Sequence, residues 1–295
     1  MKKAFIQLHI AVFLAGFTGI LGRLITLNEG LLVWYRVLFS AVALFLIAWA
    51  TGRKIAVSGK ELLKLVLVGG TMALHWAFFY GSIKYANVSI GLVCFSAVGF
   101  FTALINPIIT KNAIDYVEMA LGLLVMFGIY LIFHFDGQYR LGIILGIIGA
   151  ILAALFTIWN KKLLEKHDAR TITTYELAGG WFVLTIFLPF YLYLFPPDHI
   201  LPTLSDFFWL LSLSLLCTVL AVNLSMLALK KISPFTVSLT YNLEPVYGIL
   251  LAFAVYHENE YLGPGFYLGF GIIFVSVLLQ SYRVWKFRKR RQVTQ

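Results

Sequence analysis

Ten apolar stretches of about 20 residues, joined by short connections, take up almost the whole sequence. A helix needs about 20 apolar residues to cross the ~30 Å hydrocarbon core of a membrane. We therefore predict ten spanning helices, at residues 4–22, 31–50, 62–82, 86–105, 115–134, 141–160, 171–195, 206–228, 234–255 and 262–282. The connections leave no room for a soluble domain, so the chain is expected to form one membrane unit.

The low content of charged residues supports this interpretation. Only 12% of the residues are charged and 61% are hydrophobic, whereas a soluble domain carries about 25% charged residues. Most of the surface must therefore face lipid. We expect an all-α, multi-pass protein of a bacterial inner (plasma) membrane, with membrane lipids as its surroundings.

The basic residues predict the topology, because Lys and Arg in short loops mark the cytoplasmic side. With the N-terminus inside, all but four of the 23 Lys and Arg residues fall on that side, the exceptions being Arg23, Arg36, Lys84 and Arg140. An even number of spans follows, with both termini cytoplasmic. Residues 283–295 form a basic tail next to the last span, where such clusters meet anionic lipid. We therefore do not expect nucleic acid as a partner.

The ten spans divide into two sets of five, residues 1–138 and 139–282. Segments 86–112 and 232–258 align at an offset of 146, which pairs Gly99 with Pro245 and Asn112 with Glu258. An odd number of spans in each half would invert one half relative to the other. Inverted repeats are common in secondary transporters, which bind substrate near the midplane. The alternative is that apolar helices simply look alike.

A set of short motifs carries a resemblance to a known family. It comprises Arg36, the pairs Gly69-Gly70 and Gly81-Ser82, the run 86–101, the stretch from Tyr241 to Pro245, and Glu258. In these the chain resembles EamA-type, ten-span members of the drug/metabolite transporter superfamily. The resemblance implies two inverted five-helix repeats around a central cavity lined by spans 1–4 and 6–9, with spans 5 and 10 peripheral. It also implies movement of amino acids, related metabolites or drugs, often outward.

One position departs from that family pattern. Gly99 stands where many relatives have a proline in span 4, so a kink there is in question, and Pro107 could supply one later in the helix.

Glu244 and Pro245 lie near the middle of span 9, where a charge is costly and needs a reason. Proline removes a backbone donor, which predicts a local irregularity in the helix. The carboxylate could relay a proton or bind an ammonium group. It could equally stabilise the bend by accepting hydrogen bonds.

Arg36 lies five residues inside span 2. One interpretation is an interfacial anchor whose long side chain reaches water. The other is a clamp for a substrate carboxylate, to which the planar guanidinium is well matched.

Several polar and aromatic side chains are further candidates for contact with a substrate. Trp76 and Tyr80 share a face of span 3, since positions i and i+4 coincide on a helix, and His75 precedes them. Packing is the alternative for such a stripe. The remaining candidates are Trp159, Asn223, Tyr241 and Asn242. Glu176 is a weaker one, because it lies near a cytoplasmic end where its carboxylate could reach water.

The sequence holds no motif for catalysis or nucleotide binding. His257-Glu258 lacks the second histidine of HExxH, and no glycine-rich loop is followed by a P-loop lysine. We expect no catalytic residue, metal or cofactor. The leading hypothesis is a secondary transporter that exports small zwitterions, with aromatic or large neutral amino acids favoured. The alternatives are an intramembrane enzyme and a lipid-binding or scaffolding membrane protein.

Overall fold

The computed structural model describes residues 2–52, 57–135, 137–241 and 243–293, and these form helices joined by short connections without a strand among them. The first predicted half contains α1 (Lys2–Gly16), α2 (Thr18–Leu24), α3 (Glu29–Ala50), α4 (Gly59–Tyr85), α5 (Val88–Phe95), α6 (Val98–Thr110) and α7 (Tyr116–Phe135). The second contains α8 (Arg140–Leu163), α9 (Ala169–Leu194), α10 (Leu204–Ser214), η2 (Leu215–Leu220), α11 (Ala221–Leu229), α12 (Pro234–Tyr241), α13 (Leu243–Tyr256) and α14 (Pro264–Val293). Short 3₁₀ turns, η1 (Gly137–Tyr139) and η3 (Glu258–Glu260), precede α8 and follow α13.

The helices have the length and composition of membrane spans. In the described part of the chain, 8 helical stretches are long and apolar enough to cross a membrane, and two shorter apolar helices, Leu243–Tyr256 and Pro264–Gln280, match the ninth and tenth predicted spans. Large apolar side chains such as Trp49, Phe190 and Leu63 are exposed on the outside of the bundle, as a lipid-facing surface requires. The prediction of an all-α membrane protein is confirmed.

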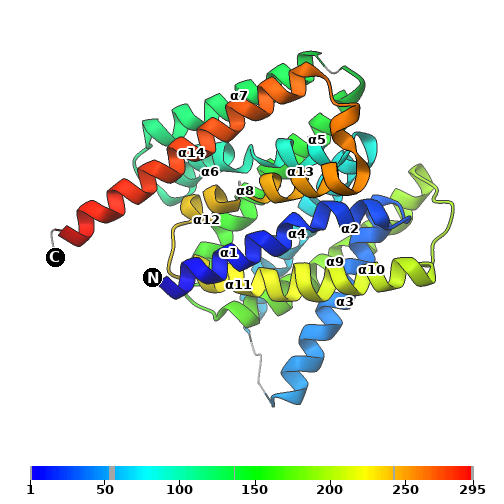
Figure 1. Cartoon of the computed structure of the whole chain (residues 1–295). Coiled ribbons are helices and arrows are strands. Elements are labelled where there is room, and N and C mark those ends of the chain that lie inside the picture. Colours follow the sequence, from blue (N-terminus) through cyan, green and yellow to red (C-terminus); the bar gives the residue numbers. More distant parts are fainter. Residues whose placement is uncertain (1, 53–56, 136, 242, 294–295) are drawn as a thin grey trace.

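Two helices stand apart from the rest of the bundle. α7 and α14 lie side by side along one edge (Figure 1). Their backbones are in close contact, since a Cβ on Gly128 would lie 2.7 Å from the Gly269 oxygen and one on Gly269 would lie 2.4 Å from the Gly128 oxygen. Small residues allow such close approach between membrane helices. These are the spans that the family resemblance predicts to be peripheral.

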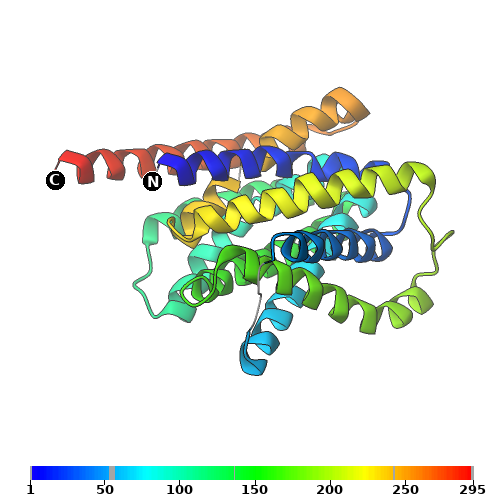
Figure 2. The ribbon, with the colours of Figure 1, turned by 90° about the horizontal axis from the view of Figure 1, so that it is seen from below.

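The beginning of α1 and the end of α14 lie at the same end of the bundle, which we call the terminal end (Figures 1 and 2). This is what an even number of spans requires. The connections α2–α3 and α9–α10 lie at the opposite end, which we call the distal end (Figure 1).

The fourth and ninth spans are each described as two helices. In the ninth, α12 and α13 are separated by residue 242, which lies outside the described residues, and Glu244 and Pro245 themselves are helical. The irregularity predicted at these two residues therefore stays a prediction. The fourth span is divided at Ser96 and Ala97, between α5 and α6. Neither Gly99 nor Pro107 marks that break, because both lie inside α6.

Candidate functional site

A cavity of about 100 Å³ lies at the centre of the bundle, bordered by helices of both predicted halves. Since about 10–15 Å³ of such volume holds one water, the cavity has room for a small molecule. Its walls are largely aromatic, with Trp76, Phe79, Phe95, Phe156 and Tyr241. Its polar groups are Thr18, Arg36, His75, Thr157, Ser225 and Glu244. No described residue of α7, α9 or α14 belongs to this lining.

Arg36 is buried, with 1% of its surface exposed, so it is not an interfacial anchor. Its Nε donates to Thr218 Oγ1 at 2.8 Å, Nη1 to the Tyr80 hydroxyl at 2.7 Å, and Nη2 to the Cys217 carbonyl at 3.4 Å. The guanidinium also stacks on Trp76, with Cζ 4.0 Å from the ring centroid. Arginine has five N–H donors, so two remain for a ligand once these three bonds among the described residues are counted.

A local change of helix type supplies two of those contacts. Span 8 runs as a π-helix through η2, Leu215–Leu220, and the side-chain hydroxyl of Thr218 donates to the Leu213 carbonyl at 2.8 Å. This wider turn presents Thr218 Oγ1 and the Cys217 carbonyl to Arg36. Such π-turns inside α-helices occur frequently at functional sites.

Glu244 lies in the same cavity with 4% of its surface exposed. Its Oε1 lies 3.3 Å from Thr18 Oγ1, which also donates to the Ala15 carbonyl at 2.6 Å. A hydroxyl has a single proton to donate, so Thr18 cannot satisfy both acceptors. Among the described residues, Glu244 forms no ion pair within 4.0 Å with Arg36. The cavity therefore contains a cation and a carboxyl group that do not neutralise each other by direct contact.

His75 is held by hydrogen bonding and by stacking. Its Nδ1 lies 2.9 Å from the Gly149 carbonyl, and because a carbonyl only accepts, Nδ1 carries the proton. The ring stacks on Phe95 and Phe156, with centroids 5.3 and 6.0 Å away. His75 thus belongs to the cavity wall as a hydrogen-bonded, buried side chain.

The structure brings some of the other predicted site residues together and separates the rest. Tyr80 lies behind Arg36 and contacts it without lining the cavity. Trp159 lies in a different place, a groove at the terminal end. Asn223 is on α11 but outside the cavity lining, and Asn242 lies outside the described residues.

Other cavity residues had no signal in the sequence strong enough to select them. Phe95 and Phe156 read as ordinary apolar residues of a span, and Thr18 as a small residue in an apolar run. Thr218 is recognisable only through the π-helix that turns it toward Arg36.

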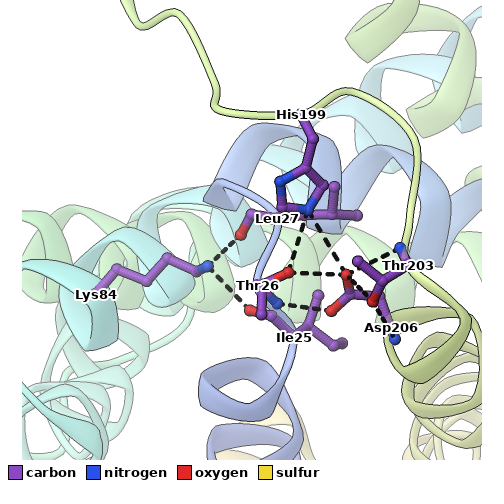
Figure 3. Close-up of polar contacts among 7 residues, drawn as sticks. All are labelled: Ile25, Thr26, Leu27, Lys84, His199, Thr203 and Asp206. Atoms are coloured by element: carbon purple, nitrogen blue, oxygen red, sulfur yellow. Dashed lines mark hydrogen bonds and ion pairs between the residues drawn. The ribbon is translucent and has the colours of Figure 1, made fainter.

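At the distal end, polar contacts clamp the α2–α3 connection between the two halves (Figure 3). Asp206 accepts from Thr26 N at 2.7 Å and from Thr26 Oγ1 at 2.8 Å, and it forms a capping box with Thr203 at the start of α10. From the other side, Lys84 Nζ donates to the carbonyls of Ile25 and Leu27.

A second distal cluster centres on Glu258, whose side chain is fully buried. Its carboxylate accepts from the backbone N–H groups of Val88 and Ser89, at 3.1 and 2.8 Å, and pairs with Arg23. A carboxylate is stabilised at a helix N-terminus by the free N–H groups and the helix dipole. These contacts join η3, which follows α13, to α5 and α2 at the distal end.

The cavity extends toward the terminal end. The cavity reaches Leu229, the last residue of α11, and Val237 in the first turns of α12. A separate groove of about 1010 Å³ lies at this end, between the beginning of α4 and the ends of α6 and α8. Most of its charged side chains are basic, among them Lys64, Lys111, Lys162, Lys166 and His167.

Comparison with known proteins gives concordant matches. A sequence model described as the EamA-like transporter family matches residues 2–134 and again 140–282. An uncharacterized transporter of Archaeoglobus fulgidus is 28% identical over 250 residues, which cover 81% of this chain and 82% of the relative. A second uncharacterized transporter of that organism is 25% identical over 151 residues, about half of each chain. One crystal structure superposes with a TM-score of 0.70 at 14% identity, over 97% of this chain and 99% of the other, a likeness of fold.

Proposed function

This chain belongs to the EamA-like transporter family, and from that membership we propose that it exports amino acids or related zwitterions by alternating access. The proposal rests on the observation that Arg36 and Glu244 both border one small buried cavity. The two unused N–H donors of Arg36 suit a carboxylate, which a guanidinium binds by two parallel hydrogen bonds. Glu244 suits an ammonium group. An amino acid carries both groups, with its own charges complementary to those of the cavity.

The cavity walls favour an apolar side chain on that substrate. The aromatic rings of Trp76, Phe79, Phe95 and Phe156 supply contact area without further charge. We therefore favour aromatic and large neutral amino acids over acidic or basic ones. A second carboxylate would meet Glu244 or the aromatic wall, and leaving a charge unpaired in a buried site costs several kcal/mol.

The two ends of the bundle support the proposed cycle. We place both termini in the cytoplasm of a bacterial cell, so the terminal end faces inward. The distal contacts of Asp206 and Glu258 then close the outer face, while the cavity reaches toward the cytoplasm. In this conformation substrate enters from inside. Release outside requires those contacts to break while the terminal end closes, a movement for which we propose two inverted repeats as the moving parts.

Counterflow in proteoliposomes tests the proposed function. Vesicles containing purified protein are loaded with unlabelled L-leucine, L-phenylalanine, L-glutamate or L-lysine, and uptake of the same labelled amino acid is followed. We expect exchange of leucine and phenylalanine well above that of glutamate and lysine. Equal, background exchange of all four in vesicles with folded protein would refute the amino acid assignment.

A further inference from the structure

Glu176 is a second membrane-embedded carboxyl group, and it lies outside the central cavity. It follows the start of α9 by seven residues, about 10 Å along a helix of 1.5 Å rise per residue. The sequence suggested that it reaches water, which is wrong, since none of its surface is exposed. α4 packs closely against it, because a Cβ on Gly69 would lie 2.0 Å from the Glu176 backbone oxygen.

The hydrogen bonds of Glu176 do not suit an ionised carboxylate. Its Oε2 accepts from Asn160 Nδ2 at 3.3 Å, a long bond, and Asn160 is itself fully buried. Within the described chain, Glu176 Oε1 and Asn160 Oδ1 have no hydrogen-bond partner. Both atoms are acceptors, so this pair lacks a donor. A proton on the carboxyl group supplies that donor, since a protonated carboxyl donates one hydrogen bond.

The charged groups of the neighbouring helices do not compensate Glu176. On α4, Lys64 faces the groove at the terminal end and His75 the central cavity. On α8, Lys161 donates to carbonyls at and just after the end of α11, the nearest being Leu229 O at 2.7 Å, and Lys162 donates to the Ile109 carbonyl. Arg36 of α3 is committed to Tyr80 and Thr218, and α11 carries no charged residue. A buried charge without a partner is strongly disfavoured.

We propose that Glu176, supported by Asn160, is a proton-binding site that is occupied in this conformation and that couples transport to a proton gradient. This inference rests on the proposed transport function but uses a site apart from the substrate cavity. Each cycle binds one proton to the carboxylate and releases it again, with no other bond made or broken. Glu244 then binds the ammonium group of the substrate, so the two carboxyl groups have separate roles.

The location offers a short route for the proton to the cytoplasmic side. The groove at the terminal end is bordered by Val68, next to Gly69 on α4, and by Trp159 and Lys161, on either side of Asn160 on α8. The groove therefore runs along the two helices that enclose Glu176. A small separation of α4 from α8 would connect the carboxyl group with water in the groove.

Infrared spectroscopy of the full-length protein in lipid tests the protonation directly and needs no substrate. A protonated carboxyl has a carbonyl band, shifted by D₂O, that a carboxylate lacks. The difference between wild type and Glu176→Gln should contain one such band at neutral pH. The exposed Glu165→Gln should leave the spectrum in this region unchanged. Absence of a difference band for Glu176→Gln overturns the proposal.

Transport in proteoliposomes tests the coupling. With L-leucine as the probe, Glu176→Gln should keep leucine exchange close to the wild-type rate but lose accumulation driven by an imposed pH gradient. Glu176→Asp, which retains a carboxyl, should keep part of that accumulation and serves if the Gln variant does not fold. Accumulation by Glu176→Gln equal to wild type, or accumulation that follows a sodium gradient instead, overturns the proposal. Absence of leucine exchange by the wild type contradicts the proposed function, and the infrared result then decides the proton site alone.

Discussion

The guanidinium of Arg36 lies over the indole ring of Trp76, with Cζ 4.0 Å from the ring centroid. Arg36 comes from α3 and Trp76 from α4, and both border the central cavity. A cation over an aromatic face is attracted by the ring quadrupole, and more strongly where water is excluded. Trp76 therefore has two roles, since it forms part of the cavity wall and orients the arginine.

The first prediction follows from this stacking. Trp76→Ala should weaken leucine binding several-fold or more, since aromatic contacts contribute about 0.5–1.5 kcal/mol beyond their buried area and 1.4 kcal/mol is a factor of ten. Isothermal titration of the purified protein measures the change. Trp49→Ala is the matched control, because Trp49 is on α3 but 82% exposed. Normal binding by a folded Trp76→Ala protein would assign Trp76 to packing alone.

The second prediction concerns the carboxylate of the substrate. Arg36→Lys keeps the charge but loses the planar set of donors that contacts Thr218, Tyr80 and the Cys217 carbonyl. Hydrogen bonds to charged groups contribute about 1.5–3 kcal/mol, so leucine binding should fall by a factor of ten or more. Leucine amide, which lacks the carboxylate, should bind the wild type weakly and the variant equally weakly. A wild-type protein that binds leucine and its amide with the same affinity would exclude Arg36 as the carboxylate site.

The third prediction concerns the contacts that close the distal end. Glu258→Gln removes the negative charge that contacts both Arg23 and the N-terminus of α5. Hydrogen bonds to charged groups contribute about 1.5–3 kcal/mol, so the closed distal end should lose about that much stabilisation. The distal end should then open more often. Cys217 borders the cavity and provides a natural probe. An impermeant thiol reagent added from the distal side should label it faster in the variant than in the wild type.

Glu260→Gln is the control for that experiment, since the Glu260 side chain is 71% exposed and its Oε1 lies 3.8 Å from His257 Nδ1. Labelling of Cys217 should stay at the wild-type rate in this variant. Equal labelling of the wild type and Glu258→Gln would mean that Glu258 supports the fold without controlling access to the cavity.

The fourth prediction concerns orientation in the membrane. A cysteine at Glu165, in the connection 164–168, should resist impermeant thiol reagents in whole cells, whereas one at Gln138 should react. Both positions are exposed, and the two native cysteines are buried. Labelling of Glu165→Cys from outside the cell would contradict cytoplasmic termini and the arrangement of five plus five spans.

The spans were predictable from the sequence because their cause is local. An apolar run of about 20 residues has few alternatives to a membrane helix. The break at Ser96 and Ala97 has no such local cause, because neither residue prevents helix formation and Gly99 and Pro107 stay helical. Tertiary packing decides it.

The site residues were predictable only in part, because their roles depend on partners far away in the sequence. Arg36 could be selected as a costly charge in a span, but its burial depends on Thr218 and Tyr80, 182 and 44 residues away. Trp159 has the same chemistry as Trp76, yet it lies in the groove and not in the cavity. For Glu176, position along the helix suggested water, whereas the close packing of Gly69 excludes it.

The last prediction separates the two embedded carboxyl groups. Glu244 borders the cavity with incomplete hydrogen bonding from Thr18, so we expect it to bind the substrate's ammonium group. Glu244→Gln retains the size of the side chain and removes its charge. Leucine affinity should fall about tenfold or more, as expected for losing a charge-assisted hydrogen bond of about 1.5–3 kcal/mol. The response of the remaining transport to a pH gradient should be unchanged.

Glu176→Gln should give the opposite pattern, with leucine affinity retained and the pH response lost. Measuring both quantities for both variants in the same proteoliposome preparation makes each variant the control for the other. If Glu244→Gln abolished the pH response and kept normal affinity, Glu244 would be the coupling carboxyl. If it changed neither quantity, its role would be to stabilise the ninth span beside Pro245.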